Sequence, residues 1–369
     1  MNTPRAGTHP DVLVVGGGAI GLLSALELAG EGLKVTVLEK GQTGQESSWA
    51  GGGILSPVDP WRAAEPIGAL CRWSRSRYPA LAERLLAETG IDPEWVRSGL
   101  LIACNGEFRD ASDWCQREHL EWLPVSPDQL AAMEPHIRIG NHALLIPEIA
   151  QIRNPRFLRA LRRATELGGV EILEGRQMDA FELSGERVKC VLASGERYCA
   201  ERFLLAAGAW SRLLTPNLIP PIQVEPVKGQ MLAYRGRPDW LSHILISDGR
   251  YLIPRRDGVI LAGSTVEYAD FDKAPTEAAR TQLEAYASSV LPDLKGCEVL
   301  RHWAGLRPGS PNGIPYICRH ARFENFYLNC GHFRNGLVSA PASARLITDI
   351  ILDRPPSISA EPYAMDAVH

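Results

Sequence analysis

The sequence predicts an α/β protein in which a discontinuous, Rossmann-like domain is joined to a second domain rich in sheet. Three observations predict this fold. A glycine-rich unit of strand, turn, helix and strand opens the chain, two later buried strands run into turns of small residues, and strand-like runs fill the region between them. The length of 369 residues is sufficient for about two domains with a sizeable core.

The composition excludes several classes of protein. Hydrophobic residues make up 45% of the chain and charged residues 22%, which is typical of globular proteins and not of disordered ones. The net charge of -4 leaves no basic footprint, so we expect neither a nucleic-acid nor a membrane partner. The cysteines form no Cys-x-x-Cys pair and lie near no suitable histidine, so we expect reduced thiols and no metal.

An apolar stretch at residues 12–26 could imitate a signal peptide. Three consecutive glycines interrupt it, no small-residue cleavage site follows it, and Glu27 ends it. A secretory or membrane-spanning role is therefore not expected. We expect a soluble, cytoplasmic protein.

The first element is a four-residue apolar run at 12–15, which predicts a strand buried on both faces. From Leu22 to Ala29 apolar residues recur at helical spacing until glycines end the helix. Residues 33–38 then predict a second strand, which Glu39 closes. Between the first strand and the helix lies the motif G-x-G-x-x-G. This order of elements is that of a Rossmann-like dinucleotide-binding unit.

Each residue of this motif has a mechanical reason. Gly16 permits the tight turn, Gly18 lets the backbone approach a pyrophosphate, and Gly21 lets the helix pack closely on the strand. Glu39 follows the last glycine at about the 20-residue spacing expected of the acid that binds ribose hydroxyls. Its charge would repel a 2′-phosphate, which disfavours NADP. The unit predicts an adenine dinucleotide, either FAD or NAD.

A second run of small residues favours the flavin. Residues 47–55 read Ser-Ser-Trp-Ala-Gly-Gly-Gly-Ile-Leu, and a nicotinamide domain has no evident need for such a segment. A flavin ring must lie against backbone with no Cβ in the way and receive amide hydrogen bonds at its polar edge. An ordinary flexible loop is the alternative reading of these residues.

Two later segments return to the same predicted sheet. Residues 202–210 form a buried strand that runs into a small-residue turn, and residues 326–330 form another strand followed by a loop at 331–336. Apolar residues from Leu337 to Ile351 then share one helical face, and Pro341 is tolerated if it falls in the first turn. The helix N-terminus there could stabilise negative charge on a reduced flavin.

The sequence resembles the D-amino-acid oxidase superfamily, and within it the glycine oxidases of thiamine biosynthesis. The resemblance runs from Val12 to Asp353 and is carried by the motifs VVGGGAIG, LEK, SSWAGGGIL, AAGAWS, YLIPR, WAGLRPG and GHFRNGL. It implies an FAD-binding domain and a substrate-binding domain of the D-amino-acid oxidase type. We place the FAD-binding domain at 1–60, 142–215 and 298–369. The substrate-binding domain takes 61–141 and 216–297, where strand-like runs occur at 229–234, 251–254 and 259–262.

The resemblance also implies contacts with a non-covalent FAD, carried over motif by motif. Met178 matches only loosely, because family members usually have a β-branched residue there. The expected contacts, which include the three motif glycines, are Gly16, Gly18, Ala19, Ile20, Gly21, Glu39, Lys40, Ser47, Ser48, Gly52, Gly53, Ile54, Met178, Gly208, His332, Phe333, Arg334, Asn335, Gly336, Leu337 and Val338.

The substrate side needs a cation for a carboxylate, and few catalytic side chains, because the flavin carries the chemistry. Arg307 is the first candidate, since a guanidinium can grip a carboxylate bidentately and the matching family arginine does so. Arg334 and Tyr251 match two further family contacts. The alternative interpretation is structural: an arginine in a glycine- and proline-containing loop often stabilises the fold, and a tyrosine at the start of a strand often belongs to the core. His332 is expected as a cofactor contact and not as a base.

The resulting hypothesis is an FAD-dependent oxidase that converts glycine to glyoxylate, ammonia and hydrogen peroxide, with dioxygen as acceptor. In the resembling family the imine can feed thiazole synthesis and the enzyme is a homotetramer. Alternatives are an oxidase of sarcosine, D-alanine or D-proline, a dehydrogenase that reduces a quinone, and a flavin-binding subunit without turnover. An NAD dehydrogenase is disfavoured, because it leaves residues 50–53 without a purpose.

Overall fold

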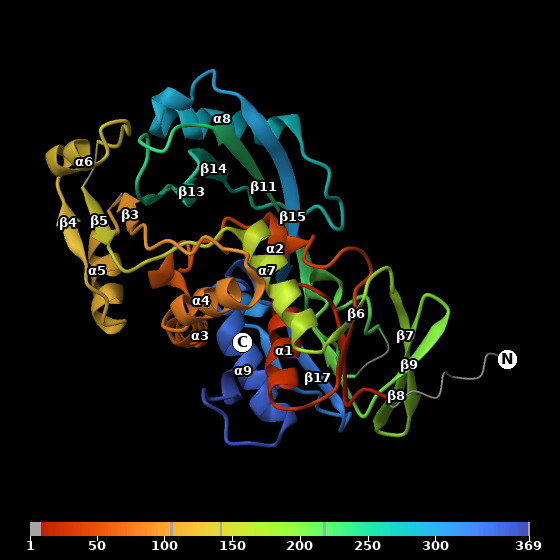
Figure 1. The fold of residues 1–369 in the computed structure, drawn as a ribbon. Helices are drawn as coiled ribbons and strands as arrows, with labels where there is room; N and C mark the ends of the chain where they lie inside the picture. The colour runs from red at the N-terminus through yellow and green to blue at the C-terminus, as the bar shows by residue number, and fades with distance from the viewer. Residues whose placement is uncertain (1–8, 104–105, 141, 217–218, 368–369) are drawn as a thin grey trace.

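The computed structural model describes residues 9–103, 106–140, 142–216 and 219–367. Its lower layer in Figure 1 is a six-stranded sheet in the order β16-β17-β10-β1-β2-β6. All neighbours in it pair in parallel except β16, which is antiparallel to β17. The strands are β1 (Val12–Val15), β2 (Val35–Leu38), β6 (Glu171–Leu173), β10 (Arg202–Leu205), β16 (Tyr316–Arg319) and β17 (Phe326–Cys330). The four strands between the two edges are buried apart from Arg202, as expected of parallel strands covered on both faces.

Five helices cover one face of this sheet and share a single hydrophobic core with it. Near the middle of this layer, α1 packs against both α7 and α9. The helices are α1 (Ala19–Gly30), α3 (Glu65–Arg75), α4 (Tyr78–Thr89), α7 (Asn154–Leu167) and α9 (Ala340–Ile351). The other face packs on a three-stranded sheet in the order β7-β8-β9. Its strands are β7 (Met178–Ser184), β8 (Arg187–Ala193) and β9 (Glu196–Cys199).

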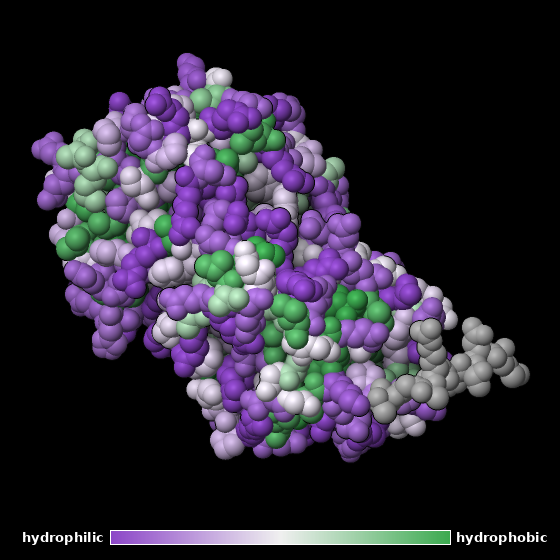
Figure 2. All heavy atoms as spheres, in the orientation of Figure 1, coloured by the Kyte–Doolittle hydropathy of each residue, from purple (hydrophilic) through white to green (hydrophobic). Residues whose placement is uncertain are grey.

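The upper layer is an eight-stranded sheet in the order β15-β11-β14-β13-β12-β3-β5-β4. Its strands are β3 (Leu100–Ala103), β4 (Leu123–Val125), β5 (Ala143–Ile146), β11 (Glu225–Arg235), β12 (Ile244–Ser247), β13 (Arg250–Pro254), β14 (Val259–Gly263) and β15 (Val299–Gly309). Its helices are α5 (Phe108–Arg117), α6 (Pro127–Met133) and α8 (Glu277–Val290), and α2 (Ser47–Ala50) lies where the two layers meet. Hydrophilic residues predominate on the surface seen in Figure 2.

Short 3₁₀ helices connect these elements, and two of them, η2 and η5, contribute to the site described below. They are η1 (Pro60–Arg62), η2 (Gly208–Trp210), η3 (Pro292–Leu294), η4 (Pro311–Gly313), η5 (Phe333–Asn335) and η6 (Glu361–Tyr363). Among the described residues, no helix is long and apolar enough to cross a membrane.

The α/β fold class and the predicted strands are confirmed, with small changes at their ends. The second strand begins at Val35 and not at residue 33, and Pro341 lies in the first turn of α9, where its missing N–H is harmless. The predicted domain boundaries stay a prediction, but two segments pack differently from the predicted division. Residues 65–89 pack with the core of the six-stranded sheet, and β15 pairs within the eight-stranded sheet.

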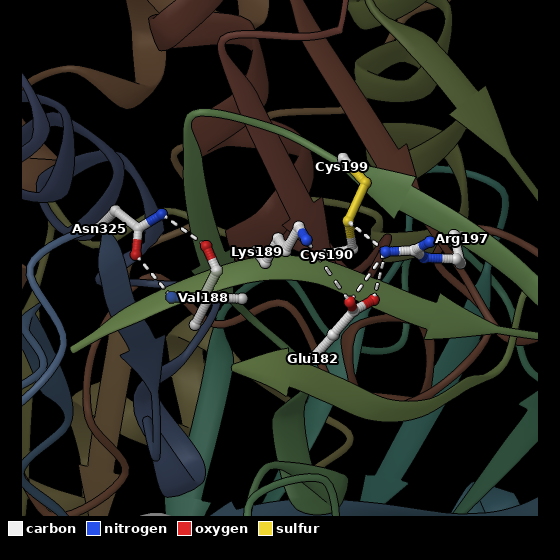
Figure 3. Close-up of a disulfide and its surroundings, with 7 residues drawn as sticks. All are labelled: Glu182, Val188, Lys189, Cys190, Arg197, Cys199 and Asn325. Atoms are coloured by element: carbon white, nitrogen blue, oxygen red, sulfur yellow. Dashed lines mark hydrogen bonds and ion pairs between the residues drawn. A yellow bond between two sulfur atoms is a disulfide. The ribbon is translucent and has the colours of Figure 1, made fainter. Parts of the chain in front are cut away.

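The expectation of reduced thiols is wrong for one pair of cysteines. Cys190 on β8 and Cys199 on β9 are register partners and form a disulfide, shown in Figure 3. The guanidinium of Arg197 lies beside the Cys190 sulfur and pairs with Glu182 on β7. Of the remaining cysteines, Cys104 lies outside the described residues, and the thiols of Cys71, Cys297, Cys318 and Cys330 are free.

Candidate active site

A cavity lies between the two layers and is lined from widely separated parts of the chain. Its lower wall is formed where β1, β2, β10 and β17 end, at their carboxyl ends. Tyr251 and Arg307, from β13 and β15, line it from the upper layer. The carboxyl edge of a parallel sheet is where open α/β folds bind their ligands, so the position itself indicates a ligand site.

The turn after β1 requires glycine at two positions. Gly16 has φ +114, and a Cβ there would lie 2.4 Å from the carbonyl oxygen of Ala206. A Cβ on Gly21 would lie 1.9 Å from the carbonyl oxygen of Gly16. Gly21 therefore serves the close packing of helix on strand and does not line the cavity, whereas Gly16 and Gly18 do.

Glu39 at the end of β2 holds this turn in place. Its carboxylate accepts hydrogen bonds from the N–H of Gly17 at 2.8 Å and from the N–H of Gly41 at 2.9 Å. The side chain is buried and also lines the cavity. A carboxylate has acceptor sites beyond these two, so Glu39 can still accept hydrogen bonds from ribose hydroxyls.

The second glycine run forms a cradle that side chains would fill. A Cβ on Gly52 would lie 2.6 Å from Cδ1 of Ile253, and a Cβ on Gly53 would lie 2.0 Å from the carbonyl oxygen of Ile152. Just before it, Ser48 Oγ accepts a hydrogen bond from the N–H of Ala19 at 3.0 Å and thereby joins α2 to α1. Backbone alone therefore forms this wall of the cavity.

The structure brings most of the predicted cofactor contacts to this one cavity. Ala19, Gly21 and Asn335 do not line it. The N–H of Ala19 is taken by Ser48, Gly21 faces Gly16, and the carbonyl of Asn335 accepts from Ser339 within the start of α9. The predicted contacts that do line it are Gly16, Gly18, Ile20, Glu39, Lys40, Ser47, Ser48, Gly52, Gly53, Ile54, Met178, Gly208, His332, Phe333, Arg334, Gly336, Leu337 and Val338.

Two buried asparagines in the cavity wall were missed from the sequence. Asn154 and Asn329 are each 1% exposed, and each donates through its side-chain nitrogen, Asn154 to the carbonyl of Ser48. Their side-chain oxygens have no partner among the described residues. A buried acceptor without a donor is costly, so both oxygens point to a ligand that donates hydrogen bonds. The sequence carries no signal for this, since Asn154 stands before a proline like an ordinary helix start.

The fit of these atoms to FAD can be tested through Asn154. We expect Asn154→Ala to weaken FAD binding about tenfold, because it removes one acceptor for the cofactor and the donor that holds the Ser48 carbonyl. Release of flavin fluorescence on dilution of the holoprotein measures the dissociation constant. Asn335→Ala is the matched control and should change it less than about twofold. A larger effect at Asn335 than at Asn154 would contradict the assignment.

Arg307 presents a cation to the cavity. Its guanidinium donates to Ser264 Oγ at 2.8 Å and to the carbonyl oxygens of Lys228 and Thr265 at 3.3 and 3.2 Å. These acceptors are neutral, and Arg307 forms no ion pair with any residue of the described ranges. Burial lowers the pKa of Arg307 below its ordinary value, yet a guanidinium remains charged. An enclosed cation without a counter-anion indicates an anionic ligand.

A glycine on the adjacent strand β11 leaves space for the Arg307 side chain. Gly229 on β11 lies beside β15, and a Cβ there would lie 2.1 Å from the guanidinium. Tyr251, which is 6% exposed, also lines the cavity, and its hydroxyl donates to Met231 Sδ at 3.7 Å. The pair offers a cation and a hydroxyl to one small ligand.

The loop after β17 supplies the third predicted substrate contact. Arg334 lies in η5 and lines the cavity. His332 just before it is 3% exposed, and its Nε2 lies 3.0 Å from Ser343 Oγ on α9. Burial lowers the pKa of His332 to about 3, so the ring stays neutral near pH 7. His332 is therefore a wall residue and not an acid.

The residues around the cavity fit FAD. The glycine turns leave space for phosphates and a flavin ring, and Glu39 can accept hydrogen bonds from ribose hydroxyls. The side-chain oxygens of Asn154 and Asn329, which have no donor among the described residues, can accept hydrogen bonds from ligand hydroxyls. Within the described ranges, no group of three or more His, Cys, Asp or Glu side chains could hold a metal ion.

Comparison with known proteins gives a consistent result. A model of the DAO family, described as FAD dependent oxidoreductase, matches residues 11–350. The glycine oxidase of Pseudomonas aeruginosa is 45% identical over 355 residues, which is 96% of this chain and 98% of that protein. The glycine oxidase of Pseudomonas putida is also 45% identical, covering 96% of this chain and 97% of its own.

Solved structures agree with these matches. The crystal structure of glycine oxidase from Geobacillus kaustophilus superposes with a TM-score of 0.93 at 26% identity, covering 98% of this chain and 99% of that one.

A longer sequence relative is the bifunctional protein ThiO/ThiG of a Synechocystis strain. It is 34% identical over 94% of this chain, which spans 52% of that longer protein.

Proposed function

Because this chain belongs to the DAO family of FAD-dependent oxidoreductases, we propose that it oxidises glycine with dioxygen. The overall reaction takes glycine, dioxygen and water to glyoxylate, ammonia and hydrogen peroxide. The single observation that carries the proposal is the enclosed guanidinium of Arg307 at the FAD cavity, which has no ion-pair partner among the residues that the structure describes. The identity to two glycine oxidases over nearly the full chain supports glycine as the substrate.

Each predicted substrate contact has a definite task in this proposal. Arg307 binds the substrate carboxylate, and Ser264 together with two backbone carbonyls fixes the plane of its guanidinium. The hydroxyl of Tyr251 orients the carboxylate, and Arg334, which lines the cavity from the opposite layer, is a second substrate contact whose charge also favours the anionic reduced flavin. The glycine cradle at 52–53 leaves space for a flat ring beside them. The protein thus supplies position and charge.

The residues that line the cavity would hold FAD, which would supply a two-electron acceptor for the α-hydrogen of the substrate, and dioxygen would take up these electrons as hydrogen peroxide. The imine product leaves the cavity and is hydrolysed to glyoxylate and ammonia. A neutral amine needs no protein base for this transfer, which agrees with the neutral, hydrogen-bonded His332. We propose further that the imine can feed thiazole synthesis, in line with the ThiO/ThiG relative. The homotetramer and the cytoplasmic location stay predictions.

The experiment uses the purified yellow holoprotein. Glycine should bleach the flavin absorbance without oxygen, and in air it should release one hydrogen peroxide for each glyoxylate formed. Sarcosine, D-alanine and D-proline serve as competitors, since one methylene changes discrimination by only about 1 to 3 kcal/mol. Bleaching without peroxide in air would indicate a dehydrogenase that uses another acceptor. No bleaching by any of these amines would refute the proposal.

A further inference from the structure

Arg255, in the YLIPR motif, is a buried cation that does not line the cavity. It follows β13, the strand that carries Tyr251, and begins the tight turn to β14. Its side chain is 7% exposed, and it forms no ion pair with a described residue. The charged neighbours that act on its pKa are Arg153, Glu94 and Asp257, and they act in opposing directions.

The three side-chain hydrogen bonds of Arg255 are made where the glycine cradle at 52–53 contacts residues 151–152, which precede α7. Its guanidinium donates to the carbonyl oxygen of Gly52 at 2.7 Å, to the carbonyl oxygen of Ile152 at 3.1 Å and to Gln151 Oε1 at 2.7 Å. The Gly53 carbonyl in turn accepts from the Ile152 N–H at 2.8 Å. One guanidinium therefore links the end of β13 in the upper layer, the glycine cradle and the residues that precede α7.

The hydrogen bond from Arg255 to the Gly52 carbonyl fixes the direction of the N–H of Gly53, which belongs to the same peptide group. In a planar trans peptide the C=O and the N–H point in opposite directions, so the N–H of Gly53 points away from Arg255. Gly52 and Gly53 line the FAD cavity, whereas Arg255 does not. No described residue accepts a hydrogen bond from the Gly53 N–H, although Gly53 is buried. Buried N–H groups are nearly always paired, so this one is free for the ligand.

We propose that Arg255 is a positioning residue for the flavin, which clamps the Gly52–Gly53 peptide so that its N–H donates to the polar edge of the flavin ring. The positive charge of Arg255 behind the carbonyl aligns the peptide dipole in the same sense. A donor and a buried cation on this side favour the electron-rich reduced ring over the oxidised one. The inference concerns the family's cofactor and does not depend on glycine being the substrate.

The test compares Arg255→Met with Arg256→Met in the purified holoprotein. Arg256 is the next residue but is exposed and pairs with Asp92, away from the cradle. For Arg255→Met we expect at least a tenfold higher FAD dissociation constant, measured by flavin release on dilution. We also expect a tenfold higher ratio of oxidised to reduced flavin at a fixed dye potential, which is about 30 mV for two electrons. Arg256→Met should match the wild type in both measurements.

The potential separates positioning from mere folding, because a loss of stability alone does not move it. Arg255→Lys keeps the charge without the three-acceptor geometry and should shift both values in the same direction, by less than the methionine variant. Should Arg255→Met fail to fold, the lysine variant decides alone. A folded variant of Arg255 with the FAD affinity and potential of the wild type would overturn the proposal, whatever its melting temperature.

Discussion

Replacing Arg307 by alanine should leave a folded, yellow protein whose affinity for glycine is lower by about 30- to 5000-fold, the effect of losing about 2 to 5 kcal/mol from one charged pair. The carboxylate then meets a cavity with no cation at this position, while the contacts to FAD at the lower layer stay in place. The Michaelis constant for glycine and the dissociation constant of a non-reacting carboxylate such as acetate, followed by flavin absorbance, both measure the loss.

A control on the same strand separates this effect from damage to β15. Arg301 is exposed, and its guanidinium lies 4.2 Å from the Trp49 ring centroid, away from the cavity lining. Arg301→Ala should leave both constants within about twofold of the wild type, as surface charges contribute little. An Arg307→Ala variant with an unchanged Michaelis constant would contradict the role of Arg307, even if peroxide is still formed.

Replacing Gly16 by alanine should give a colourless protein that is also less stable. The backbone at Gly16 is left-handed, and the added Cβ would lie 2.4 Å from the carbonyl oxygen of Ala206, the residue that follows the neighbouring strand β10. Left-handed strain of about 1 to 2 kcal/mol and overpacking of about 1 to 3 kcal/mol add to roughly 2 to 5 kcal/mol. The turn must shift, and it carries the Gly17 N–H that Glu39 holds. The ratio of flavin to protein absorbance and the urea midpoint measure the two effects.

Gly32 provides a control that shares the strain without the clash. Its φ is +87, and an added Cβ would meet nothing within 4 Å. Gly32→Ala should cost only the backbone strain of about 1 to 2 kcal/mol and keep its full flavin content. Equal flavin loss in both variants would show that the close approach to Ala206 is not what makes Gly16 necessary.

The elements that the sequence predicted well are those whose signals are local. Strand β1, the glycine turn and α1 lie within a few residues of one another, and buried parallel strands are continuous apolar runs. The packing of the helices at 65–89 against the core of the six-stranded sheet had no such local signal. Amphipathic helices show that one face is buried, but their sequence does not say which sheet covers it.

The disulfide was missed although a local signal existed. Ser194 and Gly195 both have positive φ and form a two-residue turn between β8 and β9. This turn fixes the register, and the register places Cys190 directly opposite Cys199. The orphan oxygens of Asn154 and Asn329 had no such signal, because whether a side-chain oxygen lacks a donor depends on contacts far along the chain.

The strand order also constrains when the cofactor can be bound during synthesis of the protein. The lower wall of the cavity forms only when β1, which is synthesised first, lies in one sheet with β10 and β17. Residues 326–338, which include β17, leave the ribosome about 300 residues after the glycine turn. At a translation rate of about 5 to 20 residues per second, the nascent chain waits tens of seconds with an incomplete sheet. FAD therefore binds late in synthesis, and β1 and β10 must remain unaggregated until β17 has been synthesised and has paired with β10.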